Sequence, residues 1–279
     1  MSDATLPGQG PVIIGVLNLT PDSFSDGGAY TDPARALEQA LRMAAEGAAI
    51  IDVGGESTRP GAGSIAAAEQ IRRVLPVVRA LRFALSKPVR ISIDTRSAEV
   101  AAAAIEAGAT MLNDVSAGRD DPDLLGLAAA SDLPIVLMHM QGTPETMQSD
   151  PRYQDVVAEV RSFLLARAEA AQRAGVKPER IILDPGIGFG KTQAHNIALL
   201  AQLQRLVDTG YPVLLGASRK RFMGSICAES APAVLVGATC ATTALGVAAG
   251  VRYFRVHDVQ PNRQAAEVAW AIRHSGHAV

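Results

Sequence analysis

The chain has 279 residues, 48% of them hydrophobic and 19% charged, which is enough apolar sequence for a large core, in one barrel domain or in two smaller domains. Its formal net charge of −2 excludes an electrostatic case for binding nucleic acid or an anionic membrane surface. The first residues lack a basic start followed by an apolar core, so no secretory signal peptide is expected.

Eight short apolar segments of strand length alternate with helix-like segments along the chain. Residues 1–11 are predicted to be a flexible segment, and residues 12–279 are predicted to form one domain. Strands are expected at residues 12–17, 48–53, 89–93, 110–112, 134–138, 181–183, 212–215 and 252–256. Helices are expected at residues 31–47, 66–85, 97–108, from 121, 155–174, 194–207, 231–249 and from 261.

These strands are apolar along nearly their whole length, which is typical of a parallel sheet covered by helices on both faces. Eight strand–helix units in a chain of this length predict an α/β fold with a single closed (β/α)8 barrel, the TIM barrel. A doubly wound open sheet is the alternative, although it usually has fewer strands and a clearer nucleotide-binding turn.

Polar side chains follow the strands at the points where they end. In chain order they are Asn18, Thr58 with Arg59, Asp94, Asn113, His139, Asp184, Ser218 with Lys220, and Arg255 with His257. In a parallel barrel these positions meet at one end, which is where such barrels place their active sites. One such residue can equally be a turn or helix cap, but several of these lie before the position that a cap would occupy. The interpretation of His139 stays open between a packed polar residue and a site residue.

The polar residues also divide by charge. Strands three, four and six contribute the acceptors Asp94, Asn113 and Asp184, whereas strands seven, eight, one and two contribute mainly donors. A carboxylate at a buried strand end requires donors, and a flat ring with an amino group beside a ring N–H supplies two. The donors suit a phosphate or pyrophosphate, and Asn18 is the expected ligand of a Mg²⁺ ion that shares its oxygens. We therefore expect a small-molecule substrate with such a ring and a phosphate leaving group.

The turn after the sixth strand, DPGIGFGK at residues 184–191, is rich in glycine. It is not a phosphate-binding P-loop, because Pro185 occupies the position of the first glycine. It is not a dinucleotide fingerprint either, because Lys191 occupies the position of the third glycine. The glycines instead predict a turn that packs closely against another segment.

The longest apolar stretch, residues 231–251, contains three threonines and three glycines. A buried barrel helix is therefore predicted there in preference to a membrane span. Cys227 and Cys240 lack the spacing of metal ligands, so they are expected to be reduced thiols of a cytoplasmic protein.

Seven segments, in order along nearly the whole chain, resemble the dihydropteroate synthase family. They are GVLNLTPDSFSDGG at 15–28, IDVGGESTRP at 51–60, SIDT at 92–95, LNDV at 112–115, LDPGIGFGK at 183–191, SRK at 218–220 and RVHDV at 255–259. The resemblance implies a Mg²⁺-dependent transferase of folate synthesis that is a homodimer and a target of sulfonamides. It would join p-aminobenzoate to 7,8-dihydropterin-6-methyl pyrophosphate, giving dihydropteroate and pyrophosphate.

The resemblance also implies a role for each matching residue. The pterin would be held by Asp94, Asn113, Asp184 and Lys220, of which Asp94, Asp184 and Lys220 are the expected catalytic residues. The pyrophosphate and its metal would be held by Asn18, Arg59, Arg255 and His257. The p-aminobenzoate site would be lined by Phe24, Thr58, Pro60, Phe189 and Ser218.

Three alternative functions remain. Lys220 could form a Schiff base, as in barrel lyases, although Arg219, Arg221 and Arg255 fit an anion site better. A methyltransferase that moves a methyl group from methyltetrahydrofolate to a corrinoid protein would share the barrel and some pterin contacts, although the SRK and RVH segments favour pyrophosphate. A non-catalytic paralogue would bind pterin without turnover.

Overall fold

The computed structural model describes residues 10–20, 33–58, 61–85 and 88–275. Its strands are β1 (Val12–Asn18), β2 (Ile50–Gly54), β3 (Arg90–Asp94), β4 (Met111–Asp114), β5 (Ile135–Met138), β6 (Ile181–Asp184), β7 (Leu214–Leu215) and β8 (Tyr253–Val256). Its helices are α2 (Pro33–Ala45), α3 (Ala67–Ala84), α4 (Ala98–Glu106), α5 (Asp123–Ser131), α6 (Val156–Arg173), α7 (Gln193–Ala201), α8 (Gln204–Val207), α9 (Arg221–Cys227), α10 (Val236–Ala249) and α11 (Val259–His274). Short 3-10 turns at 178–180 and 232–234 precede β6 and α10.

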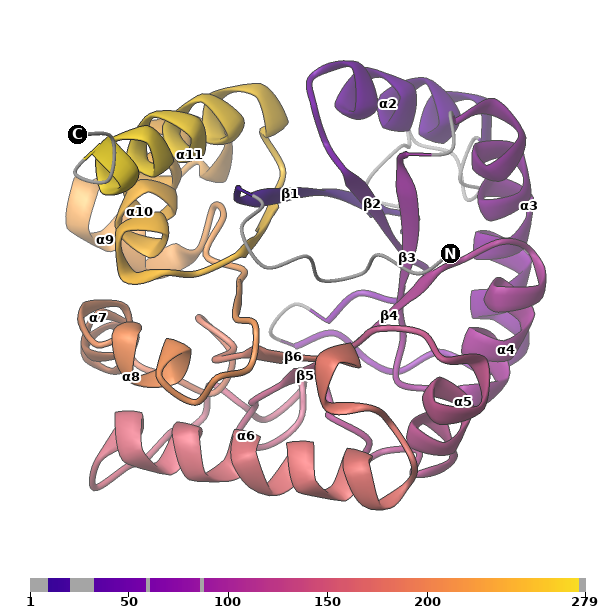
Figure 1. Ribbon diagram of the computed structural model, residues 1–279, viewed down its shortest axis with the longest axis horizontal. Helices are drawn as coiled ribbons and strands as arrows, with labels where there is room; N and C mark the ends of the chain where they lie inside the picture. The colour runs from indigo at the N-terminus through magenta and orange to yellow at the C-terminus, as the bar shows by residue number, and fades with distance from the viewer. Residues whose placement is uncertain (1–9, 21–32, 59–60, 86–87, 276–279) are drawn as a thin grey trace.

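The eight strands are parallel and close into a barrel. Hydrogen-bonded neighbours follow the order β6-β5-β4-β3-β2-β1-β8-β7. At the remaining seam, between β6 and β7, Leu183 bridges to Val213 and the Leu183 N–H donates to Pro212 O at 2.9 Å. The helices surround this ring of strands (Figure 1). The predicted single-domain (β/α)8 barrel is confirmed, and the open-sheet alternative is wrong.

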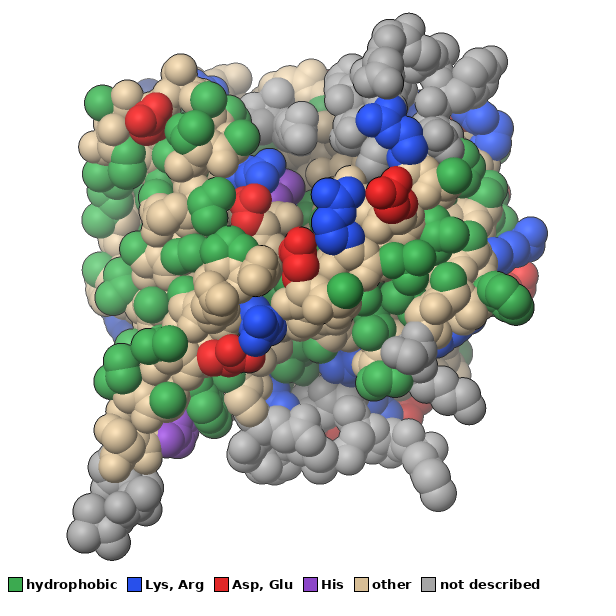
Figure 2. Space-filling view, turned by 90° about the horizontal axis from the view of Figure 1, so that it is seen from above, with side chains coloured by type: hydrophobic (Ala, Val, Ile, Leu, Met, Phe, Trp, Pro, Cys, Tyr) green, Lys and Arg blue, Asp and Glu red, His purple; other side chains and the backbone are tan. Residues whose placement is uncertain are grey.

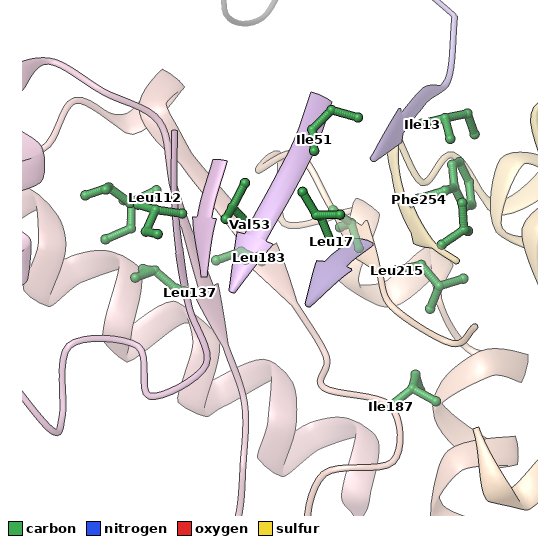
Figure 3. Close-up of a cluster of buried hydrophobic side chains, with 14 of the residues drawn as sticks. Ile13, Leu17, Ile51, Val53, Leu112, Leu137, Leu183, Ile187, Leu215 and Phe254 are labelled. Carbon is green, nitrogen blue, oxygen red and sulfur yellow. The ribbon is translucent and has the colours of Figure 1, made fainter. Parts of the chain in front are cut away.

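Each strand has one row of side chains facing the helices and one facing the barrel interior, because side chains alternate along a strand. The outer row forms the larger apolar core between strands and helices, including Leu17, Ile51, Leu183 and Phe254 (Figure 3). A separate inner cluster takes one residue from each of seven strands: Ile14, Ile50, Met111, Val136, Ile182, Leu214 and Tyr253. This cluster closes the barrel interior below the strand ends.

Two predicted helix boundaries are wrong, and one helix was not predicted. The helix expected at 194–207 divides into α7 and α8, because Gln202 leaves the helical conformation with φ −122° and ψ 26°. Helix α9 was not predicted, and it forms where Phe222 and Met223 bury their side chains in the core. The helix expected from residue 231 begins at Val236, after the 3-10 turn that starts at Pro232.

Helix α10 lies in the most apolar stretch of the chain and belongs to the barrel, as predicted. It is not fully buried, however, because Thr239 and Thr243 face the interior while Leu245 is 66% exposed. Among the described helices, none is long and apolar enough to cross a membrane. On the face shown in Figure 2, basic and acidic side chains are interspersed among hydrophobic ones, and neither sign forms a continuous patch among the described residues.

Candidate active site

The side chains inside the barrel change from apolar to polar within two residues along the strands. Two residues beyond Ile50, Met111, Ile182 and Tyr253 of the inner cluster stand Asp52, Asn113, Asp184 and Arg255. Because the period of a strand is two residues, these side chains face the same interior one layer nearer the strand ends. The strand ends therefore carry a polar layer directly above an apolar floor.

One network in this layer joins four strands. The Arg255 Nε–H donates to Asp52 Oδ2 at 2.7 Å, and Arg255 Nη2 donates to Asp94 Oδ2 at 2.8 Å. The amide of Asn113 also donates to Asp52 Oδ2, at 3.0 Å. The expected separation of acceptors from donors is therefore not found, since Arg255 lies within the group of carboxylates.

The charges of this network do not balance, because one guanidinium stands between two buried carboxylates. Burial raises the pKa of Asp94 to about 7; Arg255 opposes this, and Asp52 reinforces it. Burial alone would lower the pKa of Arg255, but Asp52 and Asp94 outweigh it and raise that pKa. Asp94 is thus a carboxyl group whose proton is easily gained and lost near neutral pH.

A second group lies at the end of β6. Asp184 accepts a hydrogen bond from the Gly186 N–H at 2.7 Å. Burial raises the pKa of Asp184 to about 6, against the opposing effects of the Gly186 N–H, Lys220, Arg255 and Lys191. The ammonium of Lys220 lies 4.0 Å from the centre of the Phe189 ring, which is cation–π distance. A carboxylate, a cation and an aromatic face are therefore brought together here.

The segments after β7 and β8 meet through Ser218 and His257. The Ser218 Oγ accepts from the His257 backbone N–H at 3.2 Å and lies 3.1 Å from His257 Nδ1. Arg219, which the sequence placed near an anion, is paired with Asp258 through two hydrogen bonds of 2.6 and 2.9 Å. Arg219 therefore holds the loop after β7 to the start of α11.

His139 is a packed polar residue. It is buried, and its ring meets Phe163 edge-on with ring centres 4.8 Å apart. Burial, with the nearby charges of Lys191 and Arg119, lowers the pKa of His139 to about 2. Its Nδ1 lies 2.9 Å from the side-chain nitrogen of the buried Lys191, within hydrogen-bond distance.

The loop after β2 is fastened at its two ends. Buried Glu56 accepts from the Ile65 N–H at 3.1 Å and from Arg96 Nη2 at 3.0 Å. Thr58, half-buried, lies between these anchors. Three residues predicted for the site, Phe24, Arg59 and Pro60, lie outside the described residues.

Asn18 suits a hard metal ion that keeps most of its waters. It ends β1 opposite Gly54, and a Cβ built on Gly54 would lie 3.6 Å from Asn18 Oδ1 and 3.5 Å from Asp94 Cβ. The described residues contain no group of three His, Cys, Asp or Glu side chains arranged to hold a metal. A single amide oxygen beside a carboxylate fits Mg²⁺ that takes its other ligands from water and phosphate.

Two important residues escaped the sequence analysis. Asp52 stands inside a strand, and the pattern Ile50-x-Asp52-x-Gly54 indicates that it faces the barrel interior two steps from an apolar residue. Lys191 closes the glycine-rich turn and is only 3% exposed. In the sequence, a charged residue within an apolar strand marks Asp52, and a charged residue at the end of a glycine-rich turn marks Lys191. The partners of both residues come from distant segments, so the sequence does not indicate them.

Comparisons with known proteins show to which family the chain belongs. A family model described as "Pterin binding enzyme" matches residues 14–257. The dihydropteroate synthase of Synechocystis sp. is 47% identical over 265 residues, covering 95% of this chain and 91% of that protein. The structure of Xanthomonas albilineans dihydropteroate synthase with 4-aminobenzoic acid is 44% identical, with a TM-score of 0.88, covering 96% of this chain and 94% of that chain.

A second structure of the Xanthomonas albilineans enzyme, in complex with 7,8-dihydropteroate, is 40% identical with a TM-score of 0.85. It covers 98% of this chain and 96% of that chain. Identity at this level over nearly the whole length confirms the resemblance of the seven sequence segments. The chain belongs to the dihydropteroate synthase family of pterin-binding enzymes.

Proposed function

We propose that this chain joins p-aminobenzoate to 7,8-dihydropterin-6-methyl pyrophosphate. The amine nitrogen forms a bond to the methylene carbon, the carbon–oxygen bond breaks, its electron pair leaves with pyrophosphate, and the amine loses a proton. One observation carries the proposal: two buried carboxyl groups, Asp94 and Asp184, share the mouth of the barrel with Asn113 and Lys220. Relatives that bind 4-aminobenzoic acid and 7,8-dihydropteroate support it.

The pterin is assigned to Asp94, Asn113, Asp184 and Lys220. A pterin presents an amino group beside a ring N–H, and an ionised carboxylate accepts both hydrogens side by side. Asp184 suits this role because, within the described part of the chain, its carboxylate accepts one hydrogen bond, from the Gly186 N–H, and keeps further acceptor capacity. Its raised pKa reflects the burial that a bound donor would offset.

The pyrophosphate is assigned to Asn18, Arg59, Arg255 and His257. The guanidinium of Arg255, which also pairs with Asp52 and Asp94, would contact the pyrophosphate. The pyrophosphate and the two carboxylates would then share one positive charge. Mg²⁺, held by Asn18 and the pyrophosphate itself, would supply positive charge to the leaving group. The p-aminobenzoate is assigned to Thr58, Phe189 and Ser218, with Phe24 and Pro60 as further expected contacts.

Asp94 stabilises the developing charge, and the amine of p-aminobenzoate is the nucleophile. Positive charge grows on the pterin methylene as pyrophosphate leaves, and a fixed carboxylate stabilises it. An aniline nitrogen is nucleophilic while uncharged, so no strong base is needed. Asp94, Asp184 and Lys220 are the proposed catalytic residues.

The assembly is proposed to be a homodimer in the cytoplasm. Helices α10 and α11 lie side by side (Figure 1), and their large exposed apolar side chains are Leu245, Val268 and Ile272, each more than 60% exposed. A second copy covering this surface would remove them from water. Cys227 and Cys240 are both free thiols, which suits a reducing compartment.

Pyrophosphate release by the purified protein tests the reaction. We expect release from the dihydropterin pyrophosphate to require Mg²⁺ and to be matched by dihydropteroate formation when p-aminobenzoate is added. Saturable pterin binding without release would instead identify a non-catalytic paralogue. Methyl transfer from methyltetrahydrofolate to a corrinoid would identify a methyltransferase, and a lysine adduct trapped by borohydride would identify a Schiff-base lyase.

A further inference from the structure

Lys191 is a buried lysine that the proposed reaction does not use. Burial lowers the pKa of its ammonium to about 7, and the nearby Asp184 opposes this shift. The Lys191 side chain is 3% exposed, which is rare for a lysine unless its ammonium is fully hydrogen-bonded. The ammonium donates to Phe189 O at 2.9 Å and to Gly186 O at 3.0 Å, and it lies 2.9 Å from His139 Nδ1. His139 O, at 3.4 Å, is a further acceptor, so every N–H of the Lys191 side chain has a partner.

Two of these acceptors are carbonyls of the turn between β6 and α7, residues 185–190. The turn requires glycine, because Gly186, Gly188 and Gly190 all have positive φ, at 65°, 83° and 59°. A Cβ on Gly186 would meet His139 O at 1.9 Å, and one on Gly190 would meet Gln141 O at 2.5 Å. The turn therefore presses on the loop after β5, as the glycine pattern predicted.

Phe189 is the aromatic residue of this turn. Its N–H donates to Gly186 O at 3.0 Å, and its own carbonyl accepts from Lys191. Both polar groups of its backbone are thus fixed, and its ring lies 4.0 Å from the Lys220 ammonium. The backbone of the turn also approaches Lys220 closely, because a Cβ added to Gly188 would lie 2.9 Å from the Lys220 side chain.

We propose that Lys191 is a positioning residue that pins the backbone of Phe189 and so holds its ring against Lys220. The inference rests on the proposed function, in which Phe189 contacts p-aminobenzoate and Lys220 contacts the pterin. No contact of Lys191 with either substrate is required. Its amino group acts through the turn, because it donates to the carbonyl oxygens of Gly186 and Phe189.

The test is a pair of substitutions at Lys191. Lys191→Met keeps the length and removes the donors, and we expect it to raise KM for p-aminobenzoate about ten- to a hundredfold, the size of effect that a displaced contact produces. Lys191→Gln keeps two donors, and we expect an intermediate KM. The KM for the pterin pyrophosphate should change by less in both variants, because Asp184 and Asn113 stand on strands.

Two control variants separate this role from general loosening. Tyr153→Phe removes a 2.7 Å hydrogen bond from the Tyr153 hydroxyl to Gly190 O. This bond holds the same turn but does not involve Lys191. Lys177→Met removes an exposed lysine that pairs with Asp132 on the surface. We expect both to keep the wild-type KM values. Equal damage from Tyr153→Phe would overturn the specific role of Lys191.

A double-mutant cycle with Phe189→Ala decides whether Lys191 acts through Phe189. We expect the double variant to have the KM of Phe189→Ala alone, whereas independent effects that multiply would overturn the proposal. Hydrogen exchange of the peptide covering residues 185–190 gives a readout without turnover. Faster exchange is expected in Lys191→Met than in Tyr153→Phe, and unchanged exchange would refute the pinning.

The same assays distinguish this inference from the proposed function. A wild-type protein that forms no dihydropteroate would refute the reaction, while the exchange measurement would still decide whether Lys191 holds the turn. An active wild type with an equally active, folded Lys191→Met variant would refute only the positioning role. If Lys191→Met does not fold, the KM and exchange of Lys191→Gln decide in its place.

Discussion

Asp94 shares the guanidinium of Arg255 with Asp52, so two buried carboxyl groups face only one positive charge within this network. Removing one of these negative charges leaves a balanced pair of Asp52 and Arg255. The position can therefore be changed without leaving an unpaired buried cation. This makes Asp94 suitable for separating a role in the reaction from a role in the fold.

Asp94→Asn is expected to lower kcat by at least about a hundredfold, because the amide cannot balance the positive charge on the pterin methylene. The fold should persist, since the asparagine has nearly the same volume. Pyrophosphate release and thermal unfolding measure the two effects. Asp132→Asn, at a surface carboxylate that pairs with Arg180, is the matched control and should leave kcat unchanged. Near-normal turnover by Asp94→Asn would exclude the proposed role.

The raised pKa of Asp94 also predicts how stability varies with pH. The ordinary pKa of an aspartate is 3.8, and that of Asp94 in the folded protein is about 7, so the folded state keeps a proton that the unfolded chain loses between these values. The contribution is fully present below about pH 4 and is lost as the pH rises to about 7. Wild type should therefore lose stability relative to Asp94→Asn across this range, by no more than about 1.4 kcal/mol per pH unit.

Denaturant unfolding at several pH values measures that difference, and a pH-independent difference would contradict it. Activity should follow the opposite direction. If the ionised forms of Asp94 and Asp184 are needed, kcat/KM rises with pH through about 6 to 7 and then levels.

At the scale of elements, the turn after β6 shows how one short segment is shaped by its neighbours. Its carbonyls are bonded by side chains from several places: Gly186 and Phe189 by Lys191, Gly188 by Gln148, and Gly190 by Tyr153. The turn thus links the ends of β5 and β6 to the start of α7. The conformation of the turn depends on the close approach of its glycines to neighbouring backbone as well as on their positive φ.

Gly186→Ala compared with Gly210→Ala separates these two causes. Both glycines have positive φ, but a Cβ on Gly210 meets nothing within 4 Å, whereas one on Gly186 would meet His139 O at 1.9 Å. Gly210→Ala should cost about 1 kcal/mol of unfolding free energy from backbone strain alone. Gly186→Ala should cost at least about 2 kcal/mol more, because backbone must move. Denaturant unfolding of both variants checks this, and equal losses would refute the close approach.

At the scale of the whole molecule, helices α10 and α11 form one unit of the outer layer. Thr243 donates to Asn262 Oδ1 at 2.7 Å, and Arg273 donates to Val247 O at 2.8 Å. Their inward faces are therefore partly polar, while Leu245, Val268 and Ile272 face outward. An apolar outer face on two joined helices is the surface proposed for a second copy.

Leu245→Lys combined with Ile272→Glu should shift the protein from dimer to monomer, because charged side chains would be buried in the interface. Sedimentation velocity at several concentrations measures the change. Phe83→Lys is the control, since Phe83 is 96% exposed on α3 and lies outside the proposed surface. A dimer that survives the double substitution, or a wild-type monomer, would refute this interface.

The amino-acid sequence was sufficient to predict the barrel and the polar mouth, because strand period and strand ends are local properties. Eight apolar segments placed Asp94, Asn113 and Asp184 at one end of a parallel sheet, and seven segments indicated the family. The spacing of glycines correctly predicted that the turn before Lys191 packs closely.

Only the tertiary structure decided which charges meet. Arg255 was expected among the donors but bonds Asp52 and Asp94, which lie 203 and 161 residues away in the chain. Lys191 and His139 meet across 52 residues, and α9 forms because its apolar side chains find a core. Such pairings depend on the order in which the strands pair in the sheet, which brings distant segments within hydrogen-bond distance, and no local pattern records that order.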